Sequence, residues 1–184
     1  LIVFVLSKDG NKIVVERLVL GGVAISSLFG AIQATLLLQA EDGRIQAALN
    51  WLIGSLNARG WQEIKFTALP ILLALFIGLF LYRQLNLLSL GDELSVSLGT
   101  SLFRSRCLIG AIATLLAACA VSIGGLIGFI GLIVPHFSRL LIGNDFKYIL
   151  PFSALIGALT LSSADLISRL GPIEIPVGIV TALL

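Results

Sequence analysis

The sequence predicts an all-α fold, a polytopic bundle of transmembrane helices. Hydrophobic residues make up 58% of the 184 residues and charged residues 12%, and the mean hydropathy is +1.07. Soluble domains carry about a quarter of their residues as charged side chains. Uncharged runs of span length also recur, separated by short polar segments. The formal net charge of +2 is too small to indicate a nucleic-acid partner.

Both ends of the chain are apolar and the sequence contains no methionine, which predicts a fragment. We expect residues 1–184 to form a single transmembrane domain that is truncated at both ends. Leu1–Leu6 is then the end of one span and Val177–Leu184 the beginning of another.

The first half of the chain predicts two complete spans joined by a surface segment. Leu18–Leu38 is long enough to cross about 30 Å of hydrocarbon. Small residues every four positions predict that one of its faces packs against protein: Gly22, Ser26, Gly30 and Ala34. Glu41–Lys65 is amphipathic and is expected to lie along the membrane surface. Phe66–Tyr82 is the next span, with Pro70 near its start.

The second half predicts shorter and broken helices. Arg83–Arg106 is expected to form two short helices with a turn near Gly91. Cys107–Ser138 is too long for one span of about 20 residues and short for two, so we expect a break at Gly124 and Gly125. The elements that follow are a polar turn at Arg139–Lys147, a span at Tyr148–Ala164 and a connection at Asp165–Pro176.

The segment GGLIGFIGLIVPHFSR, from Gly124 to Arg139, breaks a helix in sequence apolar enough for lipid. Hydrocarbon does not satisfy a broken backbone, so this segment is expected inside a helical bundle. Bundles of this kind are typical of proteins that move a solute across the membrane.

Basic residues in alternating loops predict the orientation of the chain. One set of loops is the richer in lysine and arginine and is predicted to be cytoplasmic: Lys8, Lys12, Arg17, Arg83, Arg104, Arg106, Arg139 and Lys147. The other set has half as many: Arg44, Arg59, Lys65 and Arg169.

The sequence shows no pattern for a catalytic, cofactor-binding or metal-binding site. His136 is the only histidine, no acidic residue or cysteine is near it in sequence, and we interpret it as part of a helix-end turn set by Pro135. Neither a phosphate-binding GxxxxGK[ST] loop nor a GxSxG motif occurs. Cys107 and Cys119 lie about 18 Å apart on one predicted helix, too far to bridge.

Two other classes of protein fit the composition less well. An ion-coupled secondary transporter needs acidic residues at midspan, and the complete spans contain none; only Asp165 borders one. An intramembrane enzyme needs reactive groups at membrane depth, whereas His136 and Asp165 fall near predicted helix ends.

Three blocks in order resemble the permease subunits of bacterial ATP-binding-cassette (ABC) importers for iron-siderophores, haem and cobalamin. They are LNLLSLGDELSVSLG (Leu85–Gly99), the stretch Gly124–Ala158, and ADLISR followed by EIPVGIVTALL (Ala164–Leu184). The resemblance implies ten spans per subunit. On that basis about 140 residues would be missing before this chain and about 20 after it. It also implies the bacterial inner membrane, a second permease subunit (identical or different), two cytoplasmic ATPases and an extracytoplasmic solute-binding protein, with no cofactor and no nucleic acid.

By resemblance, residues 85–99 are a cytoplasmic coupling loop that seats on the ATPase. Gly91 would permit its turn, and Asp92 and Glu93 would cap the positive end of its second helix. The apolar contact and the ends of the loop would come from Leu85, Leu87, Leu88, Leu94, Leu98 and Gly99. The alternative is an ordinary amphipathic surface loop.

Five further positions carry expected roles. Arg169 matches an arginine that docks the binding protein, or simply pairs with Asp165. Val14 and Val15 align with a cytoplasmic gate, although family members carry small hydroxyl residues there. Gln33 is a candidate for the translocation path, because an amide within a span needs a partner or water. Gly128 lies in the broken segment, our candidate for an element with two packings.

Overall fold

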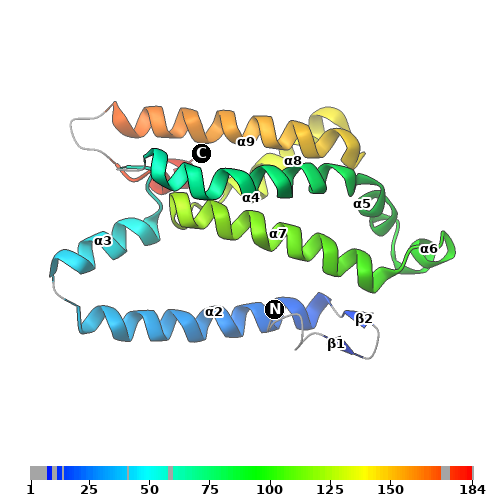
Figure 1. The fold of residues 1–184 in the computed structure, drawn as a ribbon, viewed down its shortest axis with the longest axis horizontal. Coiled ribbons are helices and arrows are strands. Elements are labelled where there is room, and N and C mark those ends of the chain that lie inside the picture. Colours follow the sequence, from blue (N-terminus) through cyan, green and yellow to red (C-terminus); the bar gives the residue numbers. More distant parts are fainter. Residues whose placement is uncertain are drawn as a thin grey trace.

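The computed structural model describes residues 8–9, 12–13, 15–40, 42–57, 60–170 and 175–183. Its long and short helices confirm the all-α class (Figure 1). The helices are α2 (Val15–Leu38), α3 (Asp42–Ile53), α4 (Trp61–Phe80), α5 (Tyr82–Ser89), α6 (Asp92–Ser97), α7 (Leu102–Gly124), α8 (Ile130–Ile142), α9 (Phe146–Arg169) and α10 (Val177–Leu183). A small antiparallel hairpin, β1 (Lys8–Asp9) with β2 (Lys12–Ile13), precedes them and pairs Lys8 with Ile13.

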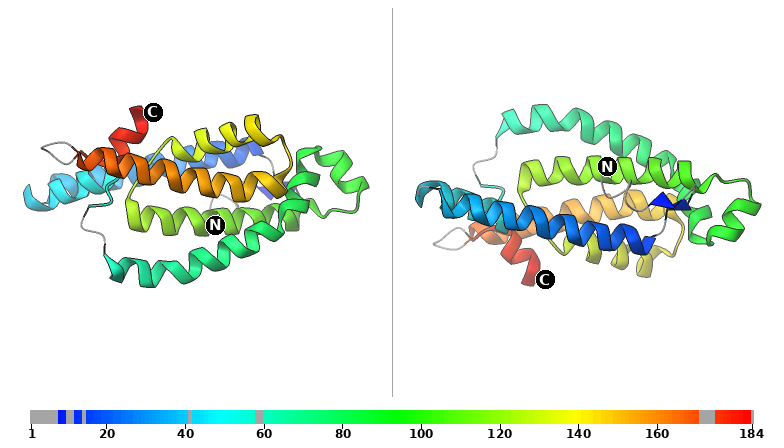
Figure 2. Two further views of the ribbon diagram at one scale, coloured as in Figure 1. Left: turned by 90° about the horizontal axis from the view of Figure 1, so that it is seen from above. Right: turned by 90° about the horizontal axis from the view of Figure 1, so that it is seen from below.

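Among the described residues, four helices are long and apolar enough to cross a membrane: α2, α4, α7 and α9. Helix α4 packs on α7, and the shorter α8 packs on α9. Seen from above, α8 and α9 lie on one side of α7 and α4 lies on the other (Figure 2). Helix α2 stands apart from this bundle and is linked to it through α3 (Figure 1). The spans of the predicted bundle are therefore present.

The core of the bundle is built mainly from small side chains. Its buried residues include Cys119, Ala164 and Val177, together with the hydroxyl residues Ser138 and Thr181. Both hydroxyls donate to carbonyl oxygens of their own helices. Small residues and self-bonded hydroxyls let membrane helices approach closely without leaving polar groups unpaired.

The small-residue face of α2 does not pack as predicted. Gly22 and Gly30 face open space, and Ser26 and Ala34 are exposed. The prediction of a face buried against protein is therefore wrong for contacts within this chain, because none of the described helices covers it.

The break between α7 and α8 confirms the predicted interruption of the long apolar run. Helix α7 ends at Gly124, Gly125 has φ +73°, and α8 begins at Ile130 after Phe129 with φ +66°. The break is held by distant backbone: Ser55 N–H donates to the Gly124 carbonyl at 2.9 Å. A carbonyl group freed by the break thus forms its hydrogen bond with another part of the protein, as the backbone of a broken membrane helix requires.

Three predicted helix ends are wrong. Helix α4 begins at Trp61, so Pro70 lies in its interior; Glu63 Oε2 accepts from Gly60 N–H at 2.9 Å and caps this earlier start. Pro135 and His136 lie within α8, which instead ends at Ile142 and is followed by Gly143 with φ +83°. Helix α9 continues beyond Ala164 to Arg169.

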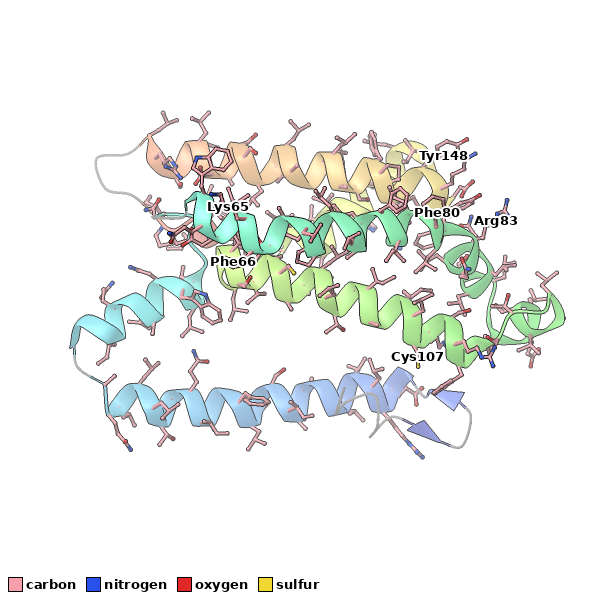
Figure 3. All side chains as sticks on the ribbon, viewed as in Figure 1. Lys65, Phe66, Phe80, Arg83, Cys107 and Tyr148 are labelled. Atoms are coloured by element: carbon pink, nitrogen blue, oxygen red, sulfur yellow. The ribbon has the colours of Figure 1, made fainter. Side chains whose placement is uncertain are left out.

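The two sets of loops lie at opposite ends of the molecule. The β1–β2 hairpin, the α5–α6 loop and the α8–α9 turn share one end, whereas α3, the start of α4 and the end of α9 share the other (Figure 1). Arg83 and Tyr148 mark the first end and Lys65 and Phe66 the second (Figure 3). This segregation agrees with the predicted topology, in which the first end is cytoplasmic.

Candidate functional site

The segment from α5 to α6 extends beyond the ends of α4 and α7 (Figure 1). As predicted, it consists of two short helices with a glycine turn: Gly91 has φ +98° and ψ +165°, a backbone conformation nearly exclusive to glycine. Gly99 follows α6 with φ +82° and ends it. The N–H of Gly99 donates to Val96 O and that of Thr100 to Ser95 O, both at 2.9 Å, which is a Schellman motif.

Ser95 holds the two helices of this loop together, a role that the sequence did not reveal. Its side chain is fully buried, and its hydroxyl lies 2.6 Å from both the Leu87 and the Gly91 carbonyl oxygens. A buried hydroxyl with two acceptors fixes the angle between α5 and α6. Serine within a short amphipathic stretch gives no sequence signal, because the first acceptor lies eight residues away.

Asp92 joins the loop to α7 instead of capping α6. Gly91 is the N-cap residue of α6 and no side chain caps it. The Asp92 carboxylate accepts from Arg106 Nη2 at 2.7 Å, and Glu93 lies in the first turn. The predicted capping role is therefore wrong for hydrogen bonding, although both acidic residues still lie near the positive end of the helix dipole.

Asn86 joins the loop to α9. Its Nδ2 donates to Asp145 Oδ1 at 2.8 Å, and its Oδ1 accepts from Phe146 N–H at 3.0 Å. Asp145 is the N-cap of α9 and also accepts from Lys147 N–H at 2.9 Å. The amide of Asn86 and the N–H of Lys147 lower the pKa of Asp145 below its usual 3.8. Residues 59 positions apart form this contact, so spacing along the chain could not reveal it.

The loop presents apolar side chains to its surroundings. Leu94 and Leu98 are 56% and 59% exposed, whereas Leu85, Leu87 and Leu88 are half-buried. The exposed apolar surface of the loop, here called the α6 patch, consists of Leu90, Leu94, Val96 and Leu98. Exposed apolar patches of this kind are typical of surfaces that contact another protein or the membrane.

Arg169 lies at the other end of the bundle and makes the predicted pair with Asp165. Its Nε and Nη2 donate to the two carboxylate oxygens at 2.9 and 3.1 Å. The guanidinium side chain is still 49% exposed, so the pair holds a positive group at this surface without covering it.

The pathway candidates are dispersed. Gln33 lies half-buried in α2, and Gly128 lies exposed in the α7–α8 loop, where a Cβ would have no atom within 4 Å. Val14 and the side chain of Val15 lie outside the described residues. The α7–α8 loop borders an apolar cavity of about 450 Å³, lined in part by Leu56.

Three glycines bring the backbones of α3, the α7–α8 loop and α10 into contact at the end opposite α6. A Cβ on Gly125 would overlap the carbonyl oxygen of Trp51, and one on Gly178 would overlap that of Ile53. Gly178 N–H also donates to Gly54 O at 3.0 Å. We call this contact the glycine junction of Gly54, Gly125 and Gly178.

Within the described residues, no group of three or more histidine, cysteine, aspartate or glutamate side chains could hold a metal ion. Cys107 is half-buried and Cys119 buried, and both are free thiols in α7.

The projecting helical loop, the broken α7–α8 pair and the apolar spans match a known family over the whole length of the chain: the model of the FecCD transport family covers residues 1–184. The chain belongs to the FecCD transport family. With its four apolar helices, this membership indicates a multi-pass protein of the inner membrane.

Curated relatives of this family member are permeases. The chain is 39% identical to the hemin transport system permease protein HmuU of Yersinia pestis over 185 residues, covering 100% of this chain and 55% of that protein. It is 39% identical to the cobalamin import system permease protein BtuC of Halobacterium salinarum (99% and 49% covered). It is 45% identical to the Fe(3+)-citrate import system permease protein YfmE of Bacillus subtilis (92% and 51%).

A solved structure supports the same fold. It represents an inward-facing conformation of an ABC transporter assigned to the metal-chelate type, and it matches with a TM-score of 0.87 and 36% identity. The match covers 91% of this chain and 55% of the solved chain. The chain thus spans about half the length of the relatives that it matches.

Proposed function

We propose that this chain is part of the permease subunit of an ABC importer for a metal chelate of the iron-siderophore, ferric citrate, haem or corrinoid kind. It provides part of the translocation path and leaves ATP hydrolysis to a separate subunit. The names of the relatives and of the solved structure support this class of substrate.

The observation that carries the proposal is the α6 patch at the end of the molecule predicted to be cytoplasmic. The loop of α5 and α6 extends beyond the spans and exposes Leu90, Leu94 and Leu98. Side-chain contacts anchor its α6 half to α7 and its α5 half to the start of α9. Apolar side chains that are exposed outside the lipid lower the free energy of the system when they are buried in a groove of another protein. Residues 85–99 therefore form the coupling loop that seats on a cytoplasmic ATPase.

The other partners follow from the same architecture. A second permease subunit completes the membrane domain, and two ATPases drive it. A solute-binding protein docks at the opposite end, where Arg169 offers its guanidinium to carboxylates. Gln33 contributes to the path, and the α7–α8 loop around Gly128 changes its packing as the path opens.

The distribution of acidic residues favours this function over ion-coupled transport. In the four long described helices, Glu16 and Glu63 lie in first turns and Asp165 lies one turn from the end of α9. A coupling-ion site at midspan would need an acidic group that these helices do not carry there.

Co-purification of the full-length permease with its ATPase tests the proposal. Leu94→Glu places a charge in the α6 patch and should reduce the retained ATPase about tenfold or more. Leu170→Glu is the matched control, because Leu170 is an exposed leucine at the C-terminal end of α9. Equal retention by both variants would refute the coupling loop, and no ATPase on the wild type would refute the importer. Uptake of ferric siderophores, ferric citrate, haem and cobalamin then identifies the substrate.

A further inference from the structure

Asn86 connects two elements that the proposed function assigns to different tasks. It lies in α5, the first helix of the coupling loop, and both ends of its amide contact the start of α9. The donor end is 2.8 Å from Asp145 Oδ1, and the acceptor end is 3.0 Å from the backbone nitrogen of Phe146. Helix α5 also packs against α9.

The contact gives α9 a second cap that comes from another helix. The first N–H groups of a helix have no partner within it. Here Asp145 accepts from Lys147 N–H and Asn86 accepts from Phe146 N–H, so a side chain of α5 provides one of the hydrogen-bond acceptors for the first turn of α9. A displacement of α5 that leaves α9 in place would break two hydrogen bonds at once.

Helix α9 reaches the opposite end of the molecule (Figure 1). Its 24 residues span about 36 Å, and they end at the Asp165–Arg169 pair. The second helix of the loop, α6, is tied instead to α7 through Asp92 and Arg106. The two halves of the coupling loop are therefore attached to different spans.

We propose that Asn86 is a positioning residue that clamps α5 to the start of α9, so that movement of the coupling loop by the ATPase moves α9 as well. This inference rests on the proposed function. Asn86 is half-buried and its two bonds lie near the surface. Water can reach the groups that its loss would free, so a variant can fold and still couple poorly.

The test uses the full-length transporter, reconstituted with its ATPase and binding protein. Asn86→Leu removes both bonds, and Asn86→Asp sets a carboxylate against Asp145. Both should retain the ATPase but transport at least about fivefold less substrate per ATP hydrolysed, the lower end of ordinary coupling between sites. The matched control is Asn144→Leu, which removes an exposed amide next to Asp145 in the α8–α9 turn and should transport like the wild type.

Exchange of the two partners separates the clamp from a general structural effect. In the wild type one oxygen, Asp145 Oδ1, accepts from both Asn86 and Lys147 N–H. In Asn86→Asp/Asp145→Asn the new carboxylate can accept from Phe146 N–H, and the new amide, after a rotation about its own side-chain bonds, can donate its NH2 group to that carboxylate while its oxygen caps α9. Coupling should recover to within about twofold of the wild type. A double variant as impaired as the single ones would overturn the clamp.

Crosslinking is a second measurement, in which a covalent link takes the place of the two hydrogen bonds of Asn86. In a background without Cys107 and Cys119, a short thiol-reactive linker joins Asn86→Cys to Asp145→Cys. If α5 and α9 move together, uptake survives the crosslink; if crosslinking blocks uptake, the two helices slide and the clamp is refuted. Normal coupling in Asn86→Leu refutes only the clamp, whereas a wild type that binds no ATPase refutes both proposals.

Discussion

Gly178→Ala probes the glycine junction, the contact on which the position of α10 depends. An alanine at a helical position ordinarily stabilises a helix by about 0.8–1.0 kcal/mol relative to glycine. At Gly178 the new Cβ would overlap the carbonyl oxygen of Ile53, which is backbone and cannot turn aside. Helix α10 must therefore move away from α3.

The cost of that movement exceeds the gain in helix propensity. Moving α10 breaks the hydrogen bond from Gly178 N–H to Gly54 O, at 3.0 Å, and such a bond contributes about 0.5–1.5 kcal/mol. Overpacking at a tight contact costs about 1–3 kcal/mol more. We expect a net destabilisation of about 1–3 kcal/mol, which lowers Tm by roughly 2–12 °C in a domain of this size.

Thermal unfolding in detergent measures the effect, with a thiol-reactive fluorophore that reports exposure of buried Cys119. The matched control is Gly131→Ala. Gly131 is also the second residue of its helix, and no atom lies within 4 Å of a Cβ there. Its Tm should stay the same or rise by a few degrees, about 2–4 °C per kcal/mol. A Tm for Gly178→Ala as high as that of the control would show that α3 and α10 do not touch in this way.

Three further predictions concern the coupling loop. Gly91→Ala forces a side chain into a glycine-only conformation at a cost of about 1–3 kcal/mol. A protease should therefore cleave the coupling loop of this variant faster than it cleaves the same loop in Gly128→Ala, and equal cleavage rates would contradict the glycine turn. Ser95→Ala leaves the Leu87 and Gly91 carbonyls without the shared hydroxyl; the rate of amide hydrogen exchange in α6 should rise about fivefold, and an unchanged rate would show that Ser95 does not hold α5 and α6 together. Because the pKa of Asp145 is lowered in the folded state, its ionised form stabilises the fold above pH 3.8, and this stabilisation is lost as the pH falls through the folded pKa. The difference in Tm between the wild type and Asn86→Leu should therefore shrink from pH 7 to pH 3. A constant difference would count against this contact.

Local patterns were sufficient for most of the fold. The uncharged runs predict α2, α7 and α9, and glycines predict both the turn at Gly91 and the break at Gly125. These features depend on a few neighbouring residues, namely on hydropathy over one span or on a backbone angle that only glycine tolerates.

Helix ends were predicted less well because capping contacts set them. Glu63 closes a cap on Gly60 and starts α4 five residues before the expected position. Pro135 removes only one hydrogen bond from α8, which continues to the positive φ of Gly143. The acidic residues at the start of α6 show the same limit, since Asp92 contacts Arg106 in place of the helix end.

The amino-acid sequence alone was enough to establish a membrane-embedded helical bundle, its broken span and its family resemblance, because hydropathy, glycine spacing and motif order are properties of the linear chain. The packing of distant segments decided the rest. Only the folded chain brings Asn86 to Asp145 and Gly178 to Ile53. Such contacts depend on where each helix lies relative to the others, and no residue pattern along one helix specifies that position.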